Sequence, residues 1–63
     1  MNAQNLIVLA RKHLNSDPSA RLCMERAIEC FDRGDLRSAK EQALRSLAYS
    51  VGKSSPVYLK ASA

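Results

Sequence analysis

Residues 32–36 read Asp-Arg-Gly-Asp-Leu, and this stretch divides the longer part of the chain into two amphipathic segments. Gly34 suits the position just past a helix end, because glycine adopts the positive φ angles found there without steric cost. Asp35 follows at once and belongs to the residue types preferred as helix N-caps. A turn this short between two helical patterns predicts an antiparallel helical hairpin.

Apolar side chains recur at helical spacing on both sides of this turn. The pattern predicts one helix over residues 18–32, with Asp17 as its N-cap and Pro18 in its first position. Its apolar stripe consists of Ala20, Cys23, Ala27, Cys30 and Phe31. A second helix is predicted over residues 35–51 and ends at Gly52; its stripe consists of Leu36, Ala39, Ala43, Leu44, Leu47, Ala48 and Val51. The alanines on both stripes predict a close approach of the two helices.

A third helix is predicted before the hairpin, over residues 3–15, because its apolar residues also share one face. They are Ala3, Leu6, Ile7, Ala10 and Leu14. After Gly52, we expect a short helical turn over residues 56–60 and a frayed end over residues 61–63. The predicted fold is all-α: one small three-helix domain over residues 1–63, made of the antiparallel hairpin, the N-terminal helix packed across it and the C-terminal turn. The residues expected to matter most for the fold are Ile7, Ala10, Ala27, Phe31, Ala39, Ala43, Leu44 and Leu47.

The length and composition limit the number of domains and the class of protein that the chain can form. The chain has 63 residues, of which 46% are hydrophobic, and a formal net charge of +4. These values are typical of one small globular domain rather than a disordered segment. Burying its apolar surface contributes ~90 kcal/mol and ordering the chain costs ~95 kcal/mol, so the two terms cancel. We therefore expect that the chain either packs very efficiently or buries additional apolar surface against a partner protein. No membrane span or secretory signal is apparent, which predicts a cytoplasmic protein without membrane contacts.

The sequence contains few groups that carry chemistry. Cys23 and Cys30 lie seven positions apart in one predicted helix, a rise of about 10.5 Å, which is too long for a disulfide. We interpret them as two small buried thiols; the alternative, a zinc site with His13, lacks the usual ligand spacing. The single histidine has no nucleophile or acid placed to work with it, and a bundle this small leaves little room for a pocket of even ~300 Å³. We therefore expect no enzyme activity, no cofactor, no metal and no small-molecule substrate.

One known family has a similar pattern of small residues around a tight turn. The matching residues are Ala20, Ala27, the Gly34-Asp35-Leu36 turn, Ala39 and Leu47. On these residues, the segment from Ala20 to Lys53 resembles a single tetratricopeptide repeat, a helix–turn–helix unit of about 34 residues. The resemblance implies a ligand-facing side on the first helix of the hairpin, which here corresponds to Arg21, Met24, Glu25, Ile28 and Phe31. The N-terminal helix covers this side in the alternative arrangement, a closed bundle without a groove.

These observations predict a non-catalytic protein-interaction module, either self-associating or binding a partner protein. The apolar surplus beyond the stripes supports it: Val8, Leu9, Met24 and Ile28. The alternative is a small basic nucleic-acid-associated regulatory protein, which the net charge and the sequence pI of about 9.5 favour. Arg33, Arg37 and Lys40 surround the start of the last long helix, where a recognition helix contacts DNA. Acidic residues interleave with them, however, and this disfavours nucleic acid as the partner.

Overall fold

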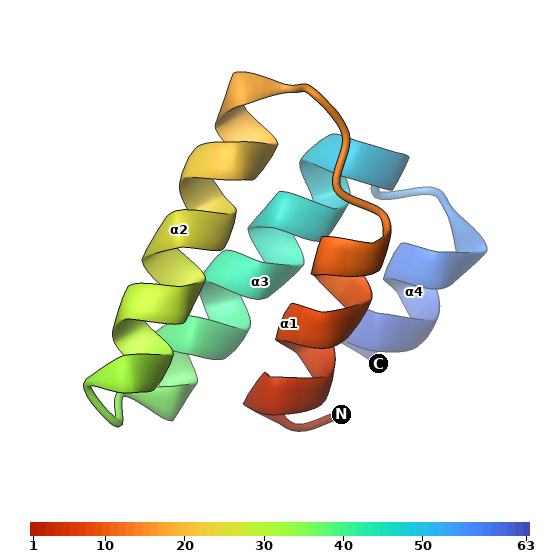
Figure 1. The fold of residues 1–63 in the computed structure, drawn as a ribbon. Coiled ribbons are helices and arrows are strands. Elements are labelled where there is room, and N and C mark those ends of the chain that lie inside the picture. Colours follow the sequence, from red (N-terminus) through yellow and green to blue (C-terminus); the bar gives the residue numbers. More distant parts are fainter.

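The computed structural model describes residues 1–63 and contains four helices and no strand. The helices are α1 (Ala3–Lys12), α2 (Pro18–Asp32), α3 (Leu36–Val51) and α4 (Pro56–Ser62). The predicted all-α architecture is confirmed, and so is the antiparallel hairpin of α2 and α3, which makes the most extensive helix contact in the molecule. Figure 1 shows α3 in the middle of the fold, where it packs against all three other helices.

Side-chain caps and glycines set the ends of the helices. Asp17 accepts a hydrogen bond from the backbone N–H of Ser19 at 2.8 Å, and Asp35 accepts one from that of Ser38 at 3.2 Å. Gly34 has a φ of 82°. Around it, the N–H of Asp35 donates to the carbonyl of Cys30 and the N–H of Gly34 donates to that of Phe31. This pair of bonds is a Schellman motif, which ends α2 and turns the chain directly into α3.

The first helix is shorter than its apolar pattern predicts. It ends at Lys12 rather than at residue 15, because the N–H of Leu14 donates to the carbonyl of Arg11 in a tighter turn. Asn15 then holds the loop: its side chain donates to the carbonyl of Ser50 at 3.3 Å and accepts from the N–H of Asp17 at 3.0 Å. The loop is therefore fastened to the end of α3.

The prediction of a frayed end over residues 61–63 is wrong. The C-terminal helix extends to Ser62, and Ala61 is buried. Its methyl group belongs to the main core cluster, so the last turn is held by tertiary packing. α4 folds back on the core: Val57 and Tyr58 both pack against that cluster.

The core is small and rich in alanine. The main cluster takes residues from every helix: Leu6, Ala10, Met24, Ala27, Ala43, Leu47 and Ala61. A smaller cluster consists of Ala3, Cys30 and Ala39. Of the residues expected to matter most, the four alanines and Leu47 are buried, whereas Ile7, Phe31 and Leu44 are half-buried against the clusters. The accessible area is 4151 Å², close to the ~4,000 Å² expected of a compact monomer of this mass.

Gly34 offers a direct test of the turn. A Cβ built at this position meets nothing within 4 Å, so a substitution changes only the backbone conformation. Gly34→Ala should lower the free energy of unfolding by about 1–2 kcal/mol, because alanine disfavours positive φ. Gly34→Asn is the matched control and should lose less, since asparagine tolerates this region. Urea unfolding followed by circular dichroism measures both; equal stability of the alanine variant and the parent would contradict the assigned turn.

Candidate functional site

The five residues predicted to face a partner lie along one side of α2, but they do not share one environment. Met24 is 4% exposed and belongs to the main core cluster, together with Leu6 and Ala10 of α1. It is therefore not available to a partner. Arg21 and Glu25 are exposed, whereas Ile28 and Phe31 are half-buried.

An apolar groove lies between α1 and α2 and reaches the surface at Ile28 and Phe31. Its volume is about 180 Å³, and its lining residues are Gln4, Ile7, Val8, Arg11, Ile28 and Phe31. We refer to these six residues as the α1–α2 groove. The first helix makes more extensive contact with α3 than with α2. As a result, α1 covers Met24 fully and leaves Ile28 and Phe31 half-buried, which is intermediate between the two arrangements that the sequence left open.

The surplus apolar residues divide between this groove and the core. Val8 is 62% exposed and lines the groove, and Ile28 lines it from the opposite helix. Leu9 packs against the core cluster instead. Sequence reasoning missed Gln4 and Arg11 as lining residues. With Val8, however, they stand at the i, i+4 and i+7 positions of α1, a spacing that places them on one face.

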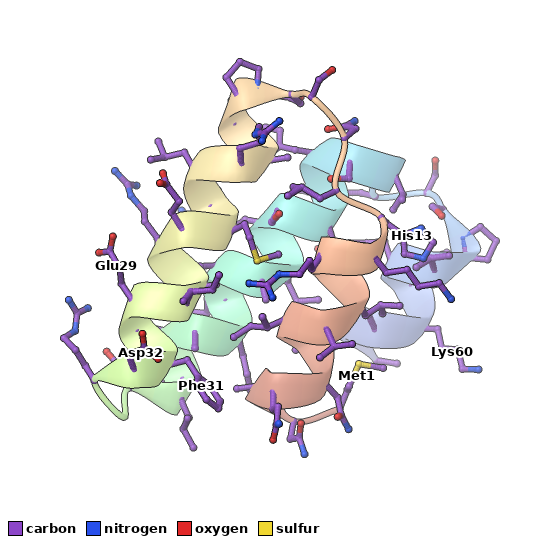
Figure 2. All side chains as sticks on the ribbon, in the orientation of Figure 1. Met1, His13, Glu29, Phe31, Asp32 and Lys60 are labelled. Carbon is purple, nitrogen blue, oxygen red and sulfur yellow. The ribbon has the colours of Figure 1, made fainter.

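The charges around the groove differ between its two ends. α1 and α2 run antiparallel, and the shorter α1 ends level with the middle of α2, because the connecting loop continues past it to the start of α2 (Figure 1). Arg11 is in the last turn of α1, and exposed Arg21 is near the start of α2. At the opposite end, Figure 2 shows Phe31 and Asp32 in the last turn of α2, and Asp32 is exposed. The end of the groove at Arg11 is therefore basic, and the end at Phe31 lies next to the exposed Asp32 carboxylate.

A larger cleft lies between α3 and α4. Its volume is about 560 Å³, and its lining residues are Glu41, Leu44, Arg45, Ala48, Tyr49, Lys53 and Tyr58. The expectation that so small a bundle has little room for a pocket is wrong for this region. The space does not come from the core: it opens where α4, after the turn at Gly52, packs against the side of α3.

The cysteines are both free and buried, as their pattern predicts. Cys30 accepts a hydrogen bond at 3.4 Å from the guanidinium of Arg33, through its Sγ atom. No group of three or more His, Cys, Asp or Glu side chains is gathered as a metal site would require. The alternative zinc site with His13 therefore has no geometry to support it, since His13 caps the C-terminal end of α1.

None of the four helices is long and apolar enough to cross a lipid bilayer. No family model matches the chain, and no curated protein or solved structure is significantly similar to it. The resemblance of residues 20–53 to a tetratricopeptide repeat therefore stays a prediction.

Proposed function

We propose that the protein is a non-catalytic interaction module that self-associates through the α1–α2 groove. The observation that carries the proposal is the 62% exposure of Val8 beside half-buried Ile7, Ile28 and Phe31. Contiguous apolar surface of this kind on a small domain is typical of protein contacts. Burying it would add stability to a core whose larger buried apolar side chains are only Leu6, Met24 and Leu47.

The charges favour a second copy as the occupant. A two-fold axis across the groove places the basic end of one copy against the acidic end of the other. Arg11 then faces the Asp32 carboxylate of its partner, and the symmetry forms this pair twice. The exposed faces of α1 and α2 are about 15 and 22 Å long, from 10 and 15 residues. An interface of this size lies at the small end of the range, so we expect a reversible, micromolar dimer.

The apolar part of the interface is tested by Val8→Asp. This variant should raise the dissociation constant at least tenfold, because it places a carboxylate in an apolar contact. Leu22→Asp is the matched control: Leu22 is exposed on α2 and does not line the groove. Sedimentation equilibrium over a hundredfold concentration range measures both. A parent protein that stays monomeric throughout would contradict self-association.

The charge pairing is tested by a swap, as the second part of the same experiment. Arg11→Asp and Asp32→Arg should each weaken the dimer about tenfold, because each sets like charges together at two symmetric positions. The double variant should recover most of the affinity. A double variant as weak as the single ones would contradict the two-fold arrangement, and would direct attention to a helix of another protein as the occupant.

A further inference from the structure

The cleft between α3 and α4 gathers most of the aromatic residues of the chain. The protein has one phenylalanine and two tyrosines, and both tyrosines line this cleft, from different helices. Tyr49 is 53% exposed, whereas Tyr58 is half-buried and packs against the core. One ring is therefore held by the fold and the other stands open to solvent. The floor between them is apolar, from Leu44 and Ala48.

Two cations stand beside the open ring. Arg45 and Lys53 are each four positions from Tyr49, on either side of it along the chain, and both are exposed. Glu41 lies one turn beyond Arg45, at the end of the cleft remote from Lys53. The charge is therefore positive around the tyrosine rings and negative only at the far end. An anion that enters the cleft is best placed between Arg45 and Lys53.

We propose that this cleft binds a nucleotide unit, with the base against the tyrosine rings and the phosphate between Arg45 and Lys53. Aromatic rings combined with flanking cations are the elements that bind single-stranded nucleic acid without sequence preference. A phosphate alone would make no use of the rings. The volume of about 560 Å³ lies within the usual range of about 300–1,000 Å³ for ligand sites.

The proposed site differs from the DNA contact that the charge pattern first suggested. Arg33, Arg37 and Lys40 lie at the start of α3 or before it, where acidic residues interleave with them. Arg45 and Tyr49 lie in the second half of α3 and Lys53 lies just after its end, where all three line the α3–α4 cleft. The site is also independent of self-association, because none of its residues lines the α1–α2 groove.

The binding test is an NMR titration of the ¹⁵N-labelled protein with four probes: adenosine monophosphate, adenosine, inorganic phosphate and single-stranded decaadenylate. We expect saturable shifts of Tyr49, Lys53 and Tyr58 with adenosine monophosphate, and at least fivefold weaker effects with adenosine or phosphate. If decaadenylate binds more than tenfold more tightly than the mononucleotide, the nucleotide unit bound in the cleft belongs to a nucleic-acid strand. If the two affinities are similar, the ligand is the free nucleotide. Absence of saturable shifts with both the mononucleotide and decaadenylate would overturn the proposal.

Variants separate a specific site from general charge attraction. Tyr49→Leu and Lys53→Gln should each weaken binding about five- to tenfold, and Lys53→Gln should lower the salt dependence of strand binding by about one ion. Lys40→Gln is the matched control, since Lys40 is exposed on α3 outside the cleft; it should change affinity less than twofold. Equal losses from Lys40→Gln and Lys53→Gln would overturn the proposal. Val8→Asp should leave nucleotide affinity unchanged, so a failure here and a failure of self-association are distinguishable.

Discussion

Leu47→Ala should leave the protein substantially unfolded at 37 °C. Leu47 is 0% exposed and lies in the main core cluster, on the central helix α3, which packs against the other three. Truncating a buried leucine to alanine lowers the free energy of unfolding by about 2–5 kcal/mol, because the apolar burial of the removed atoms is lost and a cavity is left behind. In a domain of 63 residues, a single hydrophobic core supplies only about 3–5 kcal/mol of stability, so this loss removes most of the free energy of unfolding. The alanine neighbours cannot fill the space, since their side chains have no freedom to move into it.

Urea unfolding at 10 °C, followed by circular dichroism at 222 nm, measures the change while enough variant stays folded. Leu36→Ala provides the control, because Leu36 is exposed at the start of α3. The same chemical change there should cost less than about 0.5 kcal/mol. Similar losses in the two variants would mean that Leu47 does not occupy the centre of the core.

The helix ends were the most predictable part of the fold, because local chemistry determines them. Three helix ends are marked by a capping residue or by a residue with a restricted or unusual backbone conformation. These residues are Asp17 with Pro18, Gly34 with Asp35, and Gly52. Such signals need no knowledge of the tertiary structure. The end of α1 carries no comparable signal: the helix ends at Lys12, and the loop after it is held by the bond of Asn15 to Ser50, which is 35 positions away.

Contacts between distant helices were not predictable from the same patterns. Helical periodicity shows which side chains point inward, but not which helix they meet. It therefore left open whether α1 covers the partner-facing side of α2 or leaves a groove there. Ser46 illustrates the same limit: it is fully buried because its hydroxyl donates to the carbonyl of Ala20 at 2.8 Å. Ala61 was missed although it stands four positions after Val57, because one helical turn is too short for periodicity to indicate that it packs on the core.

The two surfaces differ in how far the sequence revealed them. Val8 and Ile28 are apolar residues that lie outside the main apolar stripes of their helices. Such residues reach the surface more often than those on the stripe, so the sequence indicated the α1–α2 groove through these two positions. The α3–α4 cleft had no such signal. Tyr49 and Tyr58 come from different helices, and only the orientation of α4 brings them together. The orientation of α4 depends on the turn that begins at Gly52, and Gly52 itself has a φ of 89°.

Ala43→Leu is expected to destabilise the protein for the opposite reason to Leu47→Ala. Ala43 is 0% exposed and lies in the cluster with Met24 and Ala27 of the facing helix. The small side chains allow α2 and α3 to approach closely, so a leucine here must separate the helices or adopt a strained rotamer. Overpacking of this kind costs about 1–3 kcal/mol. For a domain of this size, such a loss lowers the melting temperature by about 5–20 °C.

Ala48→Leu distinguishes overpacking from a general intolerance of larger side chains on α3. Ala48 is half-buried and borders the α3–α4 cleft, where a leucine has room to extend. We therefore expect a melting temperature within a few degrees of the parent, since surface substitutions away from packed positions change the stability by less than about 0.5 kcal/mol. Differential scanning calorimetry measures both variants. An unchanged melting temperature for Ala43→Leu would mean that the buried face of α3 is assigned incorrectly, because only a position with free space accepts three added carbons without strain.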